Sequence, residues 1–358
     1  MNAMPPSTLT LPEIGSQSLE LLEKLCNACA VSGDEQEVRA IVLEQVKPLA
    51  EDVQVDALGN VLVRKPGSGE NRLKVMLAAH MDEVGFMIVD GDDGLYRFEL
   101  VGGIDIRQLV GKPVLVGREH LPGVIGARPI HLTTGEERER AIPLDTLRID
   151  VGPEGSKIKP GDRASFATRF QHIGPSLRAK ALDDRLGVAT LIELLKLAPA
   201  NIDLMAAFTV QEEIGLRGAR VAAYALNPDL AIVLDSTPAY DLPAWDGSEN
   251  VSYNTRLGAG PAIYVADAGT ISDRRLVDYL VGIAQAEGIP CQIRQPGGGG
   301  TDAGAIHRQR AGIPSISVSV PGRYAHTTAL ITRVEDWQNT LRLVYAALAR
   351  LDSTLLNR

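Results

Sequence analysis

The sequence predicts an α/β protein whose main domain is interrupted by a smaller, β-rich domain. Near-continuous apolar runs such as 74–80 and 204–210 are typical of strands buried in the centre of a sheet. Amphipathic stretches such as 186–197 lie between these runs, which favours a sheet covered by helices. Between residues 85 and 174, short β-rich pieces alternate with glycine and proline and no long helical pattern occurs. We therefore expect a small barrel or sandwich there.

The composition is that of a globular protein with no nucleic-acid or membrane partner. The 358 residues are 45% apolar, which is enough for a packed core. The net charge is −9 and there is no basic block, so the chain lacks the positive surface that nucleic acid or anionic lipid binds. No run approaches the roughly 18 apolar residues of a membrane span, and residues 1–17 lack the pattern of a signal peptide. Three cysteines are too few for a disulfide framework, so we expect a reducing, cytoplasmic location.

The change of pattern along the chain sets the expected domains. Residues 1–17 are expected to form an N-terminal tail, because they are rich in proline and show no strand or helix period. Residues 18–84 and 175–358 then form one α/β domain. Residues 85–174 form the β-rich domain inserted into it.

The first part of the α/β domain starts with two helices. Apolar residues at helical spacing predict a helix over 18–30 and a second helix with apolar positions from 38 to 46. Ser32 or Asp34 is expected to cap the second helix. A turn at 58–60 follows from its glycine and asparagine, and the strands of this part are expected at 53–55, 60–63 and 74–80.

The rest of the chain continues in the same way. The insert should contain short strands at 86–89, 95–100, 113–116, 124–125 and 147–151. After the insert, strands are expected at 204–210, 230–234 and 315–320. The helices of this second part are expected at 186–197, 274–287 and 336–351.

Ionisable side chains occur where the expected buried strands end. A turn at Pro321–Gly322 is expected to lead from the last of these strands to a histidine. The side chains at the strand ends, and at the start of the helix near residue 186, are His80, Asp82, Asp183, Asp184, Glu212, Glu213, Asp235 and His326. Because open α/β sheets bind ligands outside the carboxyl ends of their strands, we expect these groups to converge.

This set of side chains points to a pair of divalent metal ions. Burying carboxylates is costly unless they are paired or bind a metal. Imidazole suits zinc, and mixed sets of imidazole and carboxylate suit zinc, cobalt or manganese. A single histidine such as His80 or His326 is more often structural, and the pair Glu212–Glu213 alone is more often solvated. Only their combination at the strand ends indicates a two-metal site.

Six stretches of the sequence occur together in the order of a known family. They are Ala79–Phe86, Lys180–Arg185, Gln211–Ala219, Leu234–Thr237, Gly299–Gly304 and Arg323–Thr327. On these stretches the chain resembles the tetrahedral (TET) aminopeptidases, dinuclear metallo-exopeptidases that include glutamyl, leucyl and deblocking aminopeptidases. The resemblance implies a zinc-exopeptidase-like fold, with a mixed-sheet α/β/α catalytic domain and an inserted small β-barrel.

The resemblance also implies which residues bind the metals. One ion would be held by His80, Asp183 and Asp235. The second would be held by Asp183, Glu213 and His326, so that Asp183 bridges the two ions. Zinc is the expected metal, with cobalt or manganese as alternatives.

The implied activity is the removal of N-terminal residues from peptides. Glu212 would be the general base, taking the proton of a water whose pKa the two ions lower toward about 7. Asp82 would orient His80 by contacting its imidazole from behind. Carboxylate charge that the metals leave uncompensated would favour the free α-ammonium group of a substrate. The resemblance also suggests that the peptide bond between Asp183 and Asp184 is cis. The sequence alone does not decide this.

Self-assembly is the last property that the resemblance implies. Similar proteins form dimers that build a hollow tetrahedral dodecamer. The insert at 85–174 contributes no residue to the metal set, so we expect it to serve this assembly. The preferred N-terminal residue, the native metal and the exact oligomer are not fixed by the sequence.

Two other functions are weighed against this one. A glycoside hydrolase also uses paired carboxylates, and some similar proteins are called endoglucanases. That chemistry needs no histidine, however, and only two tryptophans are present to bind sugar rings. A catalytically inactive assembly protein is the second alternative, and the complete set of ligands and base disfavours it.

Two further motifs are assigned a structural role. The run Gly297–Gly300 lacks the Gly-Lys-Ser/Thr ending of a phosphate loop, so it is expected to line the substrate side of the site. Cys26 and Cys29 have the spacing of a redox pair, but they share an apolar helical face and are expected in the core.

Overall fold

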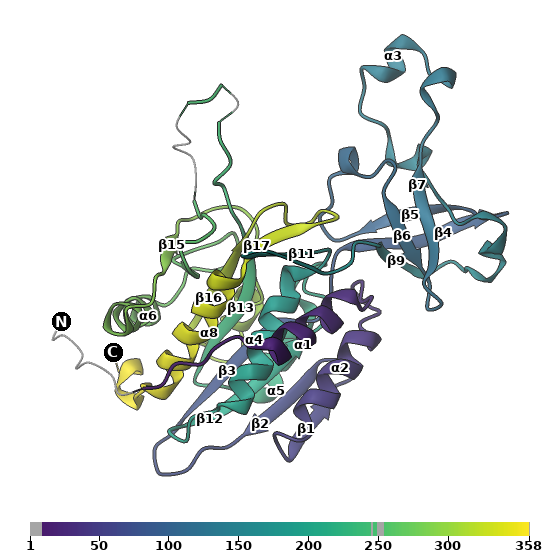
Figure 1. The fold of residues 1–358 in the computed structure, drawn as a ribbon. Coiled ribbons are helices and arrows are strands. Elements are labelled where there is room, and N and C mark those ends of the chain that lie inside the picture. The colour runs from purple at the N-terminus through teal and green to yellow at the C-terminus, as the bar shows by residue number, and fades with distance from the viewer. Residues whose placement is uncertain (1–8, 245, 249–253, 358) are drawn as a thin grey trace.

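The computed structural model describes residues 9–244, 246–248 and 254–357. It confirms the predicted α/β class with a β-barrel insert: a mixed eight-stranded sheet carries helices on both faces, and a closed six-stranded antiparallel barrel projects from it (Figure 1). Within the described ranges, no helix is both long and apolar enough to cross a bilayer.

The large sheet places four parallel strands at its centre. These strands are β12, β3, β13 and β16, and the neighbouring strands on the two sides, β2 and β14, pair with them in antiparallel orientation. In spatial order the sheet contains β1 (Asp52–Val55), β2 (Val61–Lys65), β12 (Ile202–Thr209), β3 (Leu73–His80), β13 (Leu230–Pro238), β16 (Ser315–Gly322), β14 (Ala262–Tyr264) and β15 (Gln292–Arg294). Because the central strands run in parallel, their carboxyl ends meet at one edge, which is where the candidate site lies.

Helices bury both faces of this sheet. The larger face is covered by α1 (Ser16–Asn27), α2 (Gln36–Val46), α4 (Leu182–Lys196), α6 (Arg274–Glu287) and α8 (Val334–Ala349). The smaller face is covered by α5 (Arg217–Leu226) and α7 (Ala303–Ile306). Strand β3 shows the consequence: Val75, Leu77 and Ala79 belong to the first core, whereas Met76 and Ala78 belong to the second. Burial on both faces explains why this strand is an unbroken apolar run.

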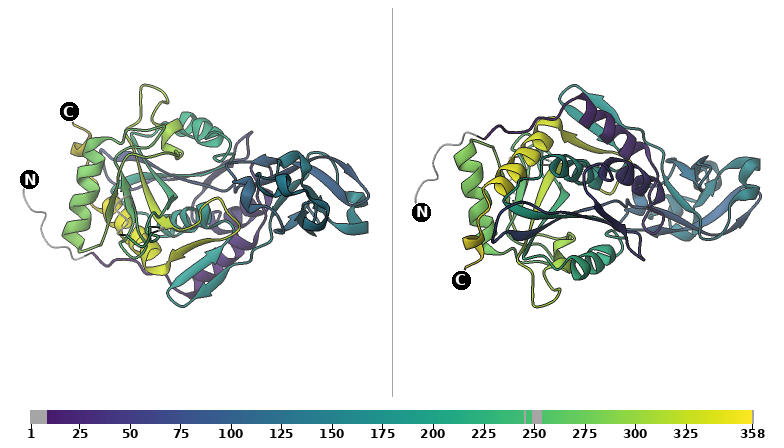
Figure 2. Two further views of the ribbon diagram at one scale, coloured as in Figure 1. Left: turned by 90° about the horizontal axis from the view of Figure 1, so that it is seen from above. Right: turned by 90° about the horizontal axis from the view of Figure 1, so that it is seen from below.

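The barrel is formed by residues that lie between β3 and β12 in the sequence (Figure 2). Its own core includes Phe86, whose ring packs edge-on against Phe98 and Phe166 with ring centroids 5.2 Å apart in each pair. A short helix, α3 (Gly135–Arg138), lies in the arm that extends beyond the barrel. In spatial order the barrel strands are β4 (Gly85–Asp92), β5 (Leu95–Val101), β8 (Arg148–Asp150), β7 (Leu121–Gly126), β6 (Pro113–Val116) and β9 (Arg163–Phe166).

A small third sheet joins the two parts of the chain. Its strands are β10 (Gln171–Ile173), β11 (Ser176–Ala179) and β17 (Leu330–Arg333). Strand β10 lies within the range expected for the insert, yet it pairs with β11 and not with the barrel. The division of the chain at 84/85 and 174/175 therefore stays a prediction.

Several local features differ from the sequence expectations. Neither Ser32 nor Asp34 caps α2, whose N-cap is Glu35, because the Ser32 hydroxyl donates to Asp82 instead. Pro321 lies inside β16 and not in a turn. A proline is tolerated there because β14 pairs with β16 only at Val318 and Ser319.

The N-terminal tail also has a defined part. Residues 1–8 lie outside the described ranges. Leu9, Leu11 and Ile14 pack against the larger core, and the backbone N–H of Ile14 donates to the side chain of Gln338 in α8 at 3.1 Å. Helix α1 then begins at Ser16, close to the expected start of the α/β domain.

Candidate metal centre

The predicted site residues meet at the carboxyl edge of the central strands. His80 is the last residue of β3, and Glu212 and Glu213 follow β12. Asp235 lies within β13, three residues before its end, so this strand is longer than the sequence indicated. His326 lies between β16 and β17, in a left-handed conformation with φ +57°.

Asp183 lies between the two histidines. Its Oδ1 is 3.3 Å from Nε2 of His80, and its Oδ2 is 3.6 Å from Nε2 of His326. One carboxylate therefore presents an oxygen to each imidazole. This is the arrangement expected of a ligand shared by two ions, and it places the remaining predicted ligands in two groups.

Each imidazole has a second carboxylate beside it. Oδ1 of Asp235 is 3.9 Å from Nε2 of His80, and Oε2 of Glu213 is 3.3 Å from Nε2 of His326. The opposite ring nitrogen of His326, Nδ1, lies 2.9 Å from the carbonyl oxygen of Gly103 in the loop after β5. Holding Nδ1 in this way leaves Nε2 directed at the carboxylates.

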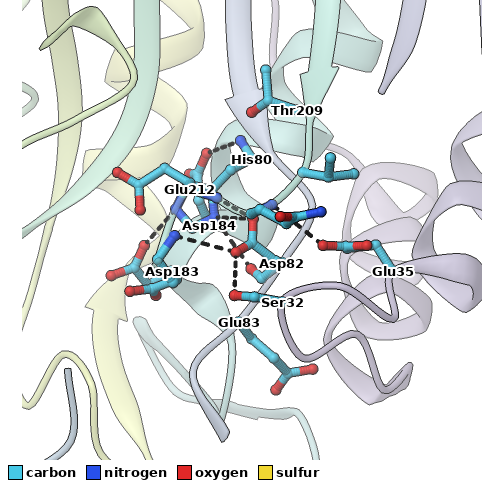
Figure 3. A network of polar contacts seen from close by, with 12 residues as sticks. Ser32, Glu35, His80, Asp82, Glu83, Asp183, Asp184, Thr209 and Glu212 are labelled. Atoms are coloured by element: carbon cyan, nitrogen blue, oxygen red, sulfur yellow. Dashed lines mark hydrogen bonds and ion pairs between the residues drawn. The ribbon is translucent and has the colours of Figure 1, made fainter. Parts of the chain in front are cut away.

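Asp82 connects the site through more contacts than the sequence indicated (Figure 3). Its Oδ1 lies 3.5 Å from Nδ1 of His80, although the carbonyl oxygen of Asp82 is closer to that nitrogen, at 3.2 Å. Its two carboxylate oxygens also accept the backbone N–H groups of Glu212 and Glu213, at 3.0 and 3.2 Å, and the Ser32 hydroxyl at 2.6 Å. Asp82 thus fixes the backbone of Glu212 and Glu213.

Asp184 is a site residue for which the sequence indicated no separate role. The peptide bond between Asp183 and Asp184 is cis. Asp184 is fully buried, and its carboxylate accepts the backbone N–H of His80 at 3.2 Å and that of Gly187 at 2.9 Å. Its carboxylate therefore ties the end of β3 to the first turn of α4.

Burial and mutual repulsion shift the pKa values of the acids in this cluster. Burial is the main cause that raises the pKa of Glu212, Glu213 and Asp235 well above the usual value, and neighbouring carboxylates add to the effect. Burial also favours the protonated form of Asp183, but the hydrogen bond and charge of His80 lower its pKa to about 2. Burial lowers the pKa of His80, yet hydrogen bonds to Asp183 and Asp82 outweigh it and raise that pKa well above normal.

The donor set fits divalent metal ions. Groups of imidazole and carboxylate atoms that lie within 4.8 Å of one another occur at His80–Asp183–Glu213 and at His80–Asp184–Asp235. Four buried or nearly buried acids face only two imidazoles, so a cation would relieve their mutual repulsion. The mixture of nitrogen and oxygen donors is one that zinc and similar transition metals accept.

Behind the acidic cluster lies a buried network with the opposite balance of charge. The carboxylate of Glu83 contacts Nζ of Lys180 at 2.5 Å and the guanidinium of Arg185 at 3.1 Å. Arg185 also donates to the carbonyl oxygen of Asp82 at 3.0 Å. Two cations thus share one carboxylate next to the predicted metal ligands, and the sequence signalled this only by placing both cations in the stretch 180–185.

A cavity of about 640 Å³ opens from the cluster. Its lining continues from the predicted ligands to Tyr264, Arg294 and the glycine run Gly298–Gly300, as expected for a substrate-side loop. Beneath it, the fully buried Asp302 accepts a hydrogen bond from the Thr209 hydroxyl. Burial raises the pKa of Asp302 to about 6.

The remaining predicted motifs lie away from the cluster. Cys26 is buried, and Cys29 is partly buried where its Sγ accepts the Ser165 hydroxyl at 3.1 Å. His120 contacts the carboxylate of Glu37 at 2.5 Å across the boundary between the barrel and α2.

Fold and site together define an α/β scaffold with a cluster of imidazoles and carboxylates at the carboxyl edge of its sheet. The family model of the M42 glutamyl aminopeptidases matches residues 59–343. The chain therefore belongs to the M42 peptidase family, and the resemblance to TET aminopeptidases is confirmed.

The relatives and solved structures agree with this assignment. A putative aminopeptidase of Acetivibrio thermocellus is 34% identical over 92% of this chain and 98% of its own. The aminopeptidase APDkam598 of Desulfurococcus kamchatkensis is 34% identical, covers 95% of this chain and 97% of its own, and superimposes with a TM-score of 0.89. The TET1 peptidase of Pyrococcus horikoshii, which can assemble into a tetrahedron or a large octahedral shell, is 34% identical over 93% of this chain and 100% of its own, with a TM-score of 0.82.

Other similar proteins carry different names. A lysyl aminopeptidase of Pyrococcus furiosus is 32% identical over 93% of this chain and 97% of its own, and a glutamyl aminopeptidase of Lactococcus lactis is 31% identical over 92% and 97%. A protein of Thermotoga maritima called an endoglucanase is 32% identical over 91% and 95%, but its TM-score is lower, at 0.73. The aminopeptidase function is thus better supported than the glycosidase alternative.

Proposed function

We propose that this aminopeptidase is a two-metal enzyme. His80, Asp183 and Asp235 would hold one ion, and Asp183, Glu213 and His326 the other. The observation that carries this assignment is the position of Asp183, whose two oxygens face the two imidazoles at 3.3 and 3.6 Å. Zinc is the proposed metal, with cobalt and manganese as alternatives for the same donors.

Bound divalent ions would lower the pKa of a water and would stabilise the negative charge that develops on a carbonyl oxygen. The chain's own contribution to proton transfer is Glu212. Its carboxylate lines the cavity, is about nine-tenths buried, and is not one of the proposed ligands. A carboxylate in this position can accept a proton from water and return it to the leaving amine.

Asp82 is proposed as a positioning residue. Because it accepts the backbone N–H of Glu212 and of Glu213, it fixes the base and one ligand relative to His80. The cavity end near these acids would accept the free α-ammonium group of a peptide, which is a physical reason for cleavage at the N-terminus.

Chelation is the direct test of the metal proposal. Treatment with a chelator should remove about two metal ions per chain, measured by elemental analysis, and should abolish hydrolysis of an aminoacyl p-nitroanilide. Adding zinc or cobalt back should restore activity. Full activity of a protein free of metal would contradict the proposal, as would a content of one ion per chain in the fully active enzyme.

The same assay separates the alternatives. A glycoside hydrolase would release sugar from a cellulose oligomer and leave the nitroanilide intact. An inactive assembly protein would bind metal and hydrolyse neither substrate.

We propose that the chain forms a dodecamer built from dimers. The arm beyond the barrel exposes apolar side chains: Ile130, Leu132 and Ile142 are 61%, 68% and 41% exposed. Such side chains are typical of surfaces covered by another subunit. Enclosure would restrict the substrates to unfolded peptides.

Light scattering measures the assembly directly. Twelve chains of 38.3 kDa should give a particle of about 460 kDa. A mass of about 77 kDa would show that only the dimer forms, and a mass near 38 kDa would contradict self-assembly altogether. Replacing Leu132 by Asp should shift the mass toward the smaller species, because it places a charge in the exposed apolar arm.

The cytoplasm is the proposed compartment. All three cysteines are free, and Cys26 is fully buried in the core. Burial raises the pKa of its thiol to about 12, which keeps it unreactive.

A further inference from the structure

We propose that Arg185 is a positioning residue that orients the imidazole of His80, and that Glu83 and Lys180 hold Arg185 in place. This inference rests on the proposed function, because it takes His80 as a metal ligand. It goes further by giving a role to the buried group of charges behind the acidic cluster. Three observations carry it: a shared backbone acceptor, the fixation of the guanidinium, and a surplus of positive charge.

The carbonyl oxygen of Asp82 links Arg185 to His80. It accepts a hydrogen bond from Nη1 of Arg185 at 3.0 Å, and Nδ1 of His80 lies 3.2 Å from the same oxygen. A carbonyl oxygen has two lone pairs and no hydrogen, so it serves both groups as an acceptor. Nδ1 of His80 then carries the ring proton, which leaves the lone pair of Nε2 for a metal ion. The position of this one oxygen therefore sets the orientation of the imidazole.

The guanidinium of Arg185 is fixed from three directions. Its Nε donates to the carbonyl oxygen of Leu25 at 3.1 Å, its Nη1 donates to Asp82, and its Nη2 contacts Oε1 of Glu83 at 3.1 Å. The side chain is fully buried. A planar guanidinium presents its donors in fixed directions, whereas the ammonium of a lysine is a compact charge on a flexible stem. The geometry therefore calls for an arginine and not only for a positive charge.

Glu83 and Lys180 complete the support. The side chain of Glu83 is buried and points away from the acidic cluster (Figure 3). Besides Arg185, its carboxylate accepts the backbone N–H of Ala30 at 2.9 Å and Nζ of Lys180 at 2.6 Å. Lys180 also donates to the carbonyl oxygen of Ala28 at 2.7 Å. The segment after α1 thus holds the carboxylate that holds Arg185.

This network carries a surplus of positive charge. Among the residues that the structure describes, the ion pairs found for Lys180 and Arg185 all end on the single carboxylate of Glu83. A buried cation without a counter-charge is costly, and the acidic cluster next to the network supplies that counter-charge. Removing a cation here would make the cluster more negative and should strengthen its binding of divalent ions. Loss of charge and loss of geometry are therefore expected to act in opposite directions.

The test measures the dissociation constants of both ions. Chelator-treated enzyme is titrated with Co²⁺ in competition with a chromophoric chelator. Arg185→Lys keeps the charge and loses the planar group. Because His80 belongs to only one proposed ligand group, one constant should rise by about 10- to 100-fold, as when an outer partner of a ligand is lost, and the other should stay within about threefold. The value of kcat/KM should fall by a similar factor.

Two further variants separate geometry from charge. Lys180→Met removes a cation but leaves the contact between Arg185 and Asp82, so neither constant should rise. Glu83→Gln keeps the shape of the carboxylate but removes the anion that holds Arg185, so it should weaken the same ion as Arg185→Lys does. Glu83→Gln also decides the question if Arg185→Lys does not fold, as judged by circular dichroism.

The matched control is Arg350→Lys. Arg350 pairs with Glu287 at the end of α6, outside the cavity lining, and this glutamate side chain is only 5% exposed. The control makes the same substitution at another partly buried ion pair. It should leave both dissociation constants and kcat/KM unchanged.

Each outcome bears on a distinct claim. Unchanged constants in folded Arg185→Lys would overturn the role of Arg185. Equal weakening of both ions would indicate a general loss of structure, and weaker binding in Lys180→Met would indicate that charge alone matters; either result would also overturn it. All three results leave the two-metal site standing. Wild-type enzyme that binds fewer than two ions would instead overturn the two-metal proposal, and this inference with it.

Discussion

Replacing Asp183 with asparagine should reduce kcat/KM by more than about 100-fold, the upper end of the loss seen when only an outer partner of a metal ligand is removed. The reason is its position between Nε2 of His80 and Nε2 of His326. An asparagine offers an oxygen to one side and an NH2 group to the other, so it cannot serve both ions. Elemental analysis should show that the variant binds fewer than two ions per chain.

The control for this variant is Asp278→Asn. Asp278 pairs with Arg274 on the exposed surface of α6, where an ion pair contributes little to stability. Metal content and activity of this control should equal those of the wild type. If Asp183→Asn kept two ions and near-normal turnover, Asp183 would not be the shared ligand and the assignment of both groups would fail.

The second large effect is expected for Glu212→Gln. Loss of a general base typically costs about 10²- to 10⁴-fold in turnover. The amide has the shape of the carboxylate but cannot accept the proton of a water. Since Glu212 is not one of the proposed ligands, the variant should keep both ions and should still bind a competitive inhibitor.

Its neighbour provides a matched comparison. Glu213→Gln changes the adjacent residue in the same way, yet it removes a proposed ligand that lies 3.3 Å from His326. We expect this variant to lose metal as well as activity, whereas Glu212→Gln loses activity alone. Turnover by Glu212→Gln within about threefold of the wild type would assign proton transfer to another residue.

The large features of the fold could be predicted because strong local patterns encode them. Apolar runs marked the central strands, and helical spacing placed α6 at its observed bounds. Helix α5 was missed because its buried face consists largely of small side chains, including Ala219, Ala222 and Ala223, and lacks the run of large apolar residues that marked the other helices. Strands β14 and β15 were missed because three residues are too few to show a period of two.

The site was predicted at the level of residues and not of contacts. Polar side chains at strand ends converge in any parallel sheet, so the sequence could place His80, Glu213 and Asp235 together. It could not show that Asp82 accepts two backbone N–H groups, because that depends on how the segment after β12 passes β3. The position of Arg294 depends in the same way on the path of the glycine run that surrounds it.

The order of the proposed ligands along the chain has a consequence for biosynthesis. They begin at His80 and end at His326, and the whole barrel is translated between His80 and Asp183. A chain still emerging from the ribosome therefore lacks the second imidazole until β16 has been made. Because metal binding and folding are coupled at such sites, hydrolysis can begin only after synthesis is nearly finished. On the proposed ligand assignment, the order of the ligands along the chain thus prevents a partly synthesised chain from completing its second metal group.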